Sequence, residues 1–175
     1  MPFLLVISGV PGTGKTSLAE AIARESHAVI CNWDWLMSGI REFPEVWDVA
    51  ANNDERRREI GWNLMSRVAE YQLRIGGSAI LDCVARARAL PAWQRIADDN
   101  GVPFFVAECS LDDLDTHRSR LDGRTRAIPA WDEVDWDWAV MSRAAYEPLP
   151  EPKLSIDSAQ PFAENLARLR QVLRT

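Results

Sequence analysis

Phe3-Leu-Leu-Val-Ile-Ser-Gly-Val-Pro-Gly-Thr-Gly-Lys-Thr-Ser17 is the stretch that decides the fold. It begins with the apolar run Phe3–Ile7, the pattern of a strand that is buried on both faces of a sheet. The run leads into Gly9–Thr16, a complete G-x-x-x-x-G-K-[ST] motif, and a helical pattern from Lys15 to Glu25 follows. The motif therefore has the context that a phosphate-binding loop requires, between a strand and a helix.

The chemistry of this loop suits a nucleoside triphosphate. Glycines let successive backbone N–H groups curl around a phosphate, and the helix N-terminus adds partial positive charge. Lys15 reaches the β- and γ-phosphates as a point charge, and the Thr16 hydroxyl is a ligand for Mg²⁺. We therefore expect ATP and Mg²⁺ as cofactors. The expected nucleotide contacts are Gly9, Val10, Pro11, Gly12, Thr13, Gly14, Lys15, Thr16 and Ser17.

Strand and helix patterns alternate along all 175 residues, which predicts one α/β domain over residues 1–175 with a mainly parallel sheet. Ligands bind such sheets at the carboxyl ends of the strands. Further strands are expected at Ala28–Cys31, Ser78–Leu81, Pro103–Glu108 and Leu154–Ile156. Further helices are expected at Trp35–Glu42, Asn53–Ile75, Pro91–Asn100, Leu111–Leu121, Asp132–Tyr146 and Phe162–Leu173.

The composition excludes several classes of protein. Acidic residues outnumber basic ones 26 to 20, giving a formal net charge of −6, which disfavours a nucleic-acid or membrane-surface binder. No apolar run approaches the ~20 residues needed to cross a bilayer. The three cysteines, Cys31, Cys83 and Cys109, have no metal-ligand spacing, so free thiols and a cytoplasmic location are expected.

Two aspartates follow apolar strands, where catalytic groups are expected. Asp82 closes the third strand and is the candidate ligand for Mg²⁺ or its waters, beside Thr16. Cys83 stands where hydrolytic motor ATPases usually carry a glutamate, which disfavours that class. Asp34 follows the second strand and is the candidate general base for an attacking hydroxyl. For both aspartates the competing interpretation is a helix N-cap.

Four arginines lie within the nine residues from Arg118 to Arg126. Arginines from a mobile lid neutralise a transferring γ-phosphoryl group, and Arg120 and Arg124 are the preferred candidates. A guanidinium can also stack on adenine. The competing interpretation is a solvated helix C-terminus, which cations favour.

Other side chains near the strand ends give weaker signals. Arg86 and Arg88 are candidates for gripping an anionic acceptor, and Trp33 and Trp35 for walling its pocket. We expect His27 and His117 to be ordinary exposed residues, and Arg56-Arg-Arg58 to form a solvated, ion-paired face.

Taken together, these residues resemble the small P-loop kinases of the AAA_33 type, which are similar to polynucleotide kinase domains, chloramphenicol phosphotransferase, gluconate kinase and zeta-toxin kinases. The resemblance rests on the phosphate loop, Asp34, Ile-Leu-Asp82, the pair in Arg120-Leu-Asp-Gly-Arg124, and Leu-Ser-Ile-Asp157. The chain departs from the family by placing Trp33 before Asp34 and Cys-Val after Asp82.

The resemblance implies a three-layer P-loop kinase sandwich, in which a five-stranded parallel sheet has the order 2-3-1-4-5. It also implies a helical lid, at about residues 118–131 here, over ATP and Mg²⁺. Asp157, Ser158 and Gln160 would then lie near the adenine.

The favoured function is an ATP- and Mg²⁺-dependent kinase that phosphorylates a hydroxyl of a small molecule, with Lys15, Asp34, Arg120 and Arg124 as the catalytic residues. One alternative is an ATP-binding or ATP-hydrolysing regulatory module. Another is a kinase that acts on a nucleotide sugar or on 5′-hydroxyl nucleic acid, the latter disfavoured by the negative net charge.

Overall fold

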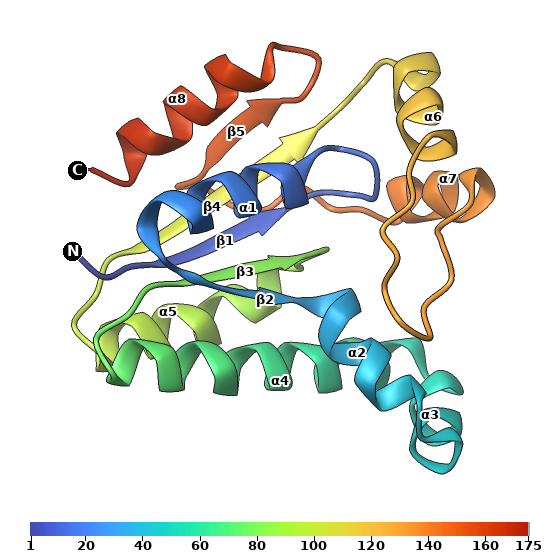
Figure 1. Ribbon diagram of the computed structural model, residues 1–175, viewed down its shortest axis with the longest axis horizontal. Coiled ribbons are helices and arrows are strands. Elements are labelled where there is room, and N and C mark those ends of the chain that lie inside the picture. Colours follow the sequence, from blue (N-terminus) through green and yellow to red (C-terminus); the bar gives the residue numbers. More distant parts are fainter. Residues whose placement is uncertain (175) are drawn as a thin grey trace.

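The computed structural model describes residues 1–174 and contains a parallel five-stranded sheet in the order β2-β3-β1-β4-β5 (Figure 1). The expected fold class and sheet order are confirmed. The strands are β1 (Leu4–Ser8), β2 (Val29–Asn32), β3 (Ala79–Cys83), β4 (Phe104–Ser110) and β5 (Leu154–Asp157). The helices are α1 (Lys15–Ser26), α2 (Trp33–Arg41), α3 (Pro44–Ala51), α4 (Asp54–Arg74), α5 (Leu90–Asp99), α6 (Leu114–Asp122), α7 (Trp136–Ala144) and α8 (Phe162–Val172), with a 3₁₀ turn η1 (Ala87–Ala89).

The core has two halves because alternate residues of each strand face opposite sides of the sheet. In β1, Leu4 and Val6 pack against α4 and α5, whereas Leu5 and Ile7 pack against α1 and α8. Figure 1 shows the resulting three layers, with α1 and α8 on one face and α4 and α5 on the other. Both faces of β1 are buried, which explains its continuous apolar run.

Capping side chains explain where several helices begin later or earlier than expected. Asn32 caps α2 by accepting a bond from Trp35 N at 3.0 Å, so the helix starts at Trp33 and the N-cap interpretation of Asp34 is wrong. Asp113 caps α6 in the same way, and Asp135 caps α7. Asp82 lies inside β3 and precedes no helix, so it is no N-cap either.

Residues 123–135 connect α6 to α7 without regular secondary structure and reach toward α2 and α3 (Figure 1). Ile128 in this loop is buried, and Ala127 and Ala130 both adopt a φ of 51°. The predicted lid, residues 118–131, thus comprises the second half of α6 and most of this loop. Among the described residues, no helix has the length and apolar character that a bilayer-spanning segment needs.

Candidate active site

The phosphate loop, residues 9–16, curves tightly because glycine occupies the two positions where its backbone lies closest to β4 and α6. Gly9 and Gly12 have φ values of 152° and 87°. A Cβ on Gly9 would lie 2.5 Å from the Cys109 carbonyl oxygen, and one on Gly12 would lie 2.7 Å from His117 Cδ2. Any larger residue at either position would therefore push the loop away from β4 or α6.

Side-chain hydrogen bonds hold the backbone of this loop in place. The Thr13 hydroxyl donates to the Val10 carbonyl at 2.8 Å, and the Ser158 hydroxyl donates to the Thr13 carbonyl at 2.5 Å. The loop ends at Gly14, which caps α1 in a left-handed conformation. The first-turn N–H groups of α1 have no helical partner, and they are the donors that a phosphate group needs.

Asp82 lies beside the loop because β3 pairs with β1 in parallel, with Asp82 opposite Ile7. It is 1% exposed, and its Oδ2 accepts a bond from Asn32 Nδ2 at 2.6 Å. Burial raises the pKa of Asp82, and this is partly offset by the charge of Lys15 and by hydrogen bonding to Thr16 and Asn32. Its Oδ1 is buried and has no partner among the described residues.

That orphaned oxygen fits a bound cation. Carboxylate and hydroxyl oxygens are ligands that Mg²⁺ prefers, and Thr16 supplies a hydroxyl next to Asp82. Within residues 1–174 no cluster of three or more His, Cys, Asp or Glu side chains offers a metal site of its own. A site with one carboxylate and one hydroxyl leaves most coordination positions for phosphate oxygens and water, as Mg²⁺ in nucleotide sites requires.

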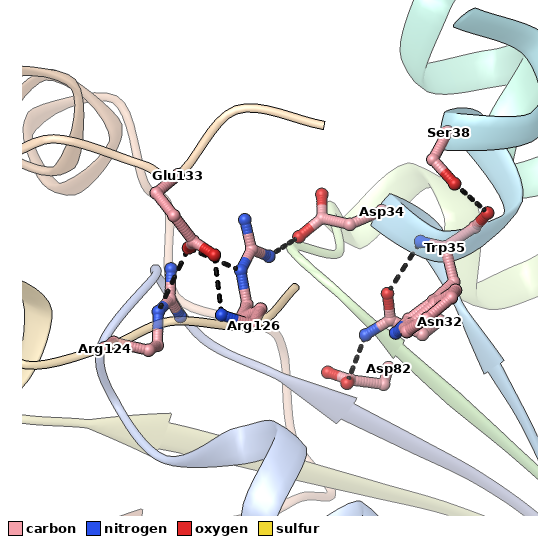
Figure 2. A network of polar contacts seen from close by, with 8 residues as sticks. All are labelled: Asn32, Asp34, Trp35, Ser38, Asp82, Arg124, Arg126 and Glu133. Atoms are coloured by element: carbon pink, nitrogen blue, oxygen red, sulfur yellow. Dashed lines mark hydrogen bonds and ion pairs between the residues drawn. The ribbon is translucent and has the colours of Figure 1, made fainter. Parts of the chain in front are cut away.

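Asp34 lies in the first turn of α2, and Asn32 lies between it and Asp82 (Figure 2). Its carboxylate is 30% exposed and forms an ion pair with Arg126. Asn32 thus links the two predicted aspartates, because it bonds to Asp82 and caps the helix that carries Asp34. Asn32 was not among the predicted site residues, although an asparagine between a strand and a helix is a recognisable capping signal.

Arg124 and Arg126 converge on Glu133 across the 123–135 loop (Figure 2). Arg126 bonds to Glu133 through Nε at 3.1 Å and through its backbone N–H at 2.6 Å, and Arg124 Nε lies 4.0 Å from the same carboxylate. Each guanidinium keeps a buried Nη2 without a partner in the described part of the chain.

Burial and the neighbouring charge of Arg126 lower the pKa of Arg124, while Glu133, Asp34 and Asp82 act in the opposite direction. Arg124 and Arg126 therefore each keep one unsatisfied N–H group near the carboxylates of Glu133 and Asp34. An anionic group of a ligand would accept hydrogen bonds from both guanidinium groups.

Arg120 occupies a different place from Arg124. Its Nη2 donates to the Ser158 carbonyl at 2.9 Å, and its side chain lines a cavity of about 220 Å³ beside the phosphate loop. The other residues lining this cavity are Thr13, Gly14, Ser17, Leu18, Ser158, Gln160, Phe162 and Asn165. Arg120 therefore lies beside Ser158 and the cavity, whereas Arg124 lies beside Glu133.

Asp157 does not line that cavity, in contrast to Ser158 and Gln160. Its carboxylate accepts bonds from Ala159 N at 2.9 Å and from Gln160 Nε2 at 3.2 Å. Asp157 therefore shapes the turn between β5 and α8 that carries its two neighbours.

Arg86 and Arg88 were predicted to bind an anionic acceptor, but both side chains contact other residues of the protein. Arg86 donates to the Ala145 carbonyl, and Arg88 pairs with Glu55 while its guanidinium stacks over the Trp62 ring at 5.2 Å. Neither guanidinium is therefore free for an acceptor in this conformation.

The expected exposure of His117 is wrong. The side chain is 1% exposed, and its Nε2 lies 2.6 Å from the Pro11 carbonyl oxygen, on the outer side of the phosphate loop. Periodicity alone gave no sign of this, because the contact joins residues 106 positions apart.

The comparison with protein families agrees with this geometry. The profile of the AAA domain family AAA_33 matches residues 4–147. The chain belongs to this family. No curated protein sequence matches the chain.

Solved structures of small kinases share the fold over nearly the whole chain. A sugar kinase from Janibacter sp. has a TM-score of 0.69 at 18% identity, covering 99% of this chain and 95% of its own. A gluconokinase from Sinorhizobium meliloti has a TM-score of 0.59 at 20% identity, covering 99% and 96%. A shikimate kinase from Bacteroides thetaiotaomicron has a TM-score of 0.66 at 16% identity, covering 99% of both chains. The chain therefore has the fold of the small P-loop kinases.

Proposed function

We propose that the protein is an ATP- and Mg²⁺-dependent phosphotransferase that moves the γ-phosphoryl group of ATP to a hydroxyl of a small-molecule acceptor. The observation that carries the proposal is the set of unsatisfied polar atoms around Asp34 and Asp82. The charge of Arg124 interacts with those of both aspartates. Among the described residues, a carboxylate oxygen of Asp82 and guanidinium nitrogens of Arg124 and Arg126 are buried without partners. A phosphate group with its magnesium ion supplies partners for all three.

In this proposal the loop amides and Lys15 hold the β- and γ-phosphates, and Thr16 with Asp82 would hold Mg²⁺. When bound, the ion neutralises charge on the phosphates during transfer. The cavity beside Arg120 has room for the nucleoside. Arg124 adds positive charge where the γ-phosphoryl group moves, which favours the transition state over the ground state.

Asp34 serves as the general base. The acceptor oxygen attacks the γ-phosphorus, the bond to the β–γ bridging oxygen breaks, ADP leaves, and Asp34 takes the hydroxyl proton. The ion pair of Asp34 with Arg126 has to open before this step, because the carboxylate oxygen that is bound to the guanidinium cannot at the same time accept the hydroxyl proton. Opening also frees Arg126 to contact the anionic ligand.

The acceptor is a compact polyhydroxylated molecule in this proposal. Sugar, gluconate and shikimate are the substrates named by the kinases of similar fold. The net charge of −6 opposes binding of a nucleic-acid acceptor. Three buried free thiols suit a reducing compartment such as the cytoplasm.

The proposal is tested by measuring ADP formation with a panel of sugars, sugar acids, polyols, nucleosides, nucleotide sugars and 5′-hydroxyl oligonucleotides. We expect turnover with one class of small hydroxyl compound and loss of that turnover in Lys15→Ala. Equal ADP formation with and without every acceptor would instead indicate an ATP-hydrolysing module, and turnover with an oligonucleotide alone would contradict the small-molecule assignment.

Asp34→Asn separates the base from a merely structural role. We expect the rate of phosphoryl transfer to fall at least about 100-fold while the Kd for Mg²⁺·ATP stays unchanged, because Asp34 acts on the acceptor proton. Single-turnover transfer and calorimetric ATP binding measure the two quantities. A parallel loss of both would show that Asp34 supports the fold of the site instead.

A further inference from the structure

Three carbonyl groups of the phosphate loop are held by hydrogen bonds to side chains. The Val10 carbonyl accepts from Thr13, and the Thr13 carbonyl accepts from Ser158. The Pro11 carbonyl is bonded to His117 Nε2 at 2.6 Å. His117 belongs to α6, so this bond joins the loop to the helix that carries Arg120 (Figure 1).

The direction of a carbonyl fixes the direction of the next N–H group, because a peptide unit is planar and trans. The Pro11 carbonyl and the Gly12 N–H belong to one such unit. Proline has no N–H of its own, so Gly12 provides the loop's first amide after Val10. A bond that holds the Pro11 carbonyl toward α6 therefore turns the Gly12 N–H in the opposite direction, which we infer to be the inside of the loop, where phosphate binds.

The bond also identifies the donor atom of His117. Because Nε2 faces a carbonyl oxygen, it carries a proton and donates to it. Nδ1 is buried and has no partner within residues 1–174. Leaving a buried polar nitrogen unpaired opposes folding, so an apolar ring would suit this position better if packing alone were its role.

The surroundings of His117 fit a ring that is held in one orientation. Trp136 packs edge-on against it, with ring centroids 5.4 Å apart. On the other side, Gly12 leaves no room for a side chain, since an added Cβ would lie 2.8 Å from His117 Nε2 and 3.0 Å from Leu121 Cγ. The imidazole thus sits against the loop backbone without freedom to turn away.

We propose that His117 is a positioning residue for nucleotide binding: its Nε2–H holds the Pro11 carbonyl outward and thereby presents the Gly12 amide to the phosphates of ATP. The inference rests on the proposed function, because it concerns the same nucleotide. It adds that His117 joins α6 to the phosphate loop.

Calorimetric titration with Mg²⁺ and a non-hydrolysable ATP analogue tests the proposal on the full chain. His117→Phe keeps an aromatic ring but loses the donor, and His117→Gln places an amide donor near the position of Nε2. Ser119→Ala, an exposed substitution on the same helix, is the matched control. We expect the Kd to rise about tenfold in His117→Phe and to stay within about threefold of wild type in the other two.

Thermal unfolding without nucleotide gives the readout that a structural role would move. We expect His117→Phe to unfold within a few degrees of wild type although it binds ATP more weakly. Should that variant fail to fold, His117→Asn, whose shorter amide does not reach Pro11, takes its place with the same expected loss of affinity. An unchanged Kd in the donor-free variant, or equal weakening in His117→Gln, would overturn the proposal. Absence of nucleotide binding by the wild-type protein would instead overturn the proposed function.

Discussion

Asn32 has two structural roles beside the two aspartates. Its Oδ1 caps α2, and its Nδ2 donates to Asp82 at 2.6 Å. One amide thus starts the helix that carries Asp34 and orients the carboxylate that faces Thr16. Because Nδ2 occupies Oδ2 of Asp82, the unpaired Oδ1 is the oxygen left for a cation.

Asp82→Asn should separate stability from function. Burial raises the pKa of Asp82 above its ordinary value of 3.8, so stability is lost as the pH rises toward the folded-state pKa and stays lost at neutral pH. The asparagine variant avoids that loss, so we expect its unfolding free energy at pH 7 to rise. Its ATP affinity should no longer increase when Mg²⁺ is added.

Urea unfolding at pH 7 and nucleotide titrations with and without Mg²⁺ measure both effects. A less stable variant that still responds to Mg²⁺ would contradict the assignment of Asp82 as the metal-side carboxylate.

Sequence reasoning located the residues of the site that follow strands. Parallel strands end at one edge of the sheet, so Asp34 and Asp82 could be placed near the phosphate loop from order alone. The partners of Arg126 and His117 were outside its reach. Arg126 pairs with a residue 92 positions away, and His117 is buried only because Gly12 permits close approach.

At the scale of elements, the 123–135 loop is joined to α2 and α3 by aromatic packing. Trp131 lies between Trp33 and Trp47, with both pairs edge-to-face at 5.7 Å between centroids. Arg41 stacks on Trp47 and Trp131 and pairs with Asp132 at 2.5 Å. Of the two tryptophans predicted to wall an acceptor pocket, Trp33 contacts Trp131 of this loop, whereas Trp35 is 53% exposed.

Trp131→Ala should loosen this loop and leave the sheet intact. The lost aromatic and cation–π contacts are each worth about 0.5–1.5 kcal/mol, so opening of the loop becomes at least about tenfold more frequent. We expect trypsin to cleave after Arg124 and Arg126 about tenfold faster, with little change in the global unfolding temperature. Trp138→Ala, a change to a 43% exposed tryptophan of α7, is the control. Equal cleavage rates in all three proteins would show that Trp131 does not hold the loop.

The strands were predicted more completely than the helices. All five strands were placed within two residues, and β1 and β3 are buried along their whole length, as their apolar runs indicate. The helix Pro44–Ala51 was missed, since an eight-residue helix gives little periodicity. Its Trp47 has its packing partner 84 positions later, in the lid.

At the scale of the whole molecule, one buried polar network ties the connector before β5 to the sheet. Glu108 at the end of β4 accepts bonds from Tyr146 and from Leu149 N, both at 2.7 Å, and pairs with Lys153 at 2.5 Å. Tyr146 also bonds to Ser8, the residue before the phosphate loop, at 3.0 Å. Lys153 therefore has a structural role.

Acidification should weaken this network. Burial alone would raise the pKa of Glu108, but hydrogen bonds from Lys153, Leu149 and Tyr146 outweigh it and lower the pKa below its ordinary value of 4.5. The stability that Glu108 contributes is therefore present above pH 4.5 and is lost as the pH falls through its folded-state value.

Glu108→Gln should reduce the dependence of unfolding free energy on pH in that acidic window and lower stability at neutral pH. Denaturant titrations from pH 3 to pH 7 measure both, with exposed Glu147→Gln as the control. A wild-type slope in Glu108→Gln would mean that other carboxylates govern acid unfolding.

Calorimetric titration of the wild-type protein and of Lys15→Ala with ATP and Mg²⁺ tests the central claim most directly. We predict one nucleotide per chain for the wild type, with affinity that depends on Mg²⁺, and no measurable binding by the variant. Equal heat from both proteins, or none from the wild type, would contradict the assignment of residues 9–16 as the grip on the triphosphate.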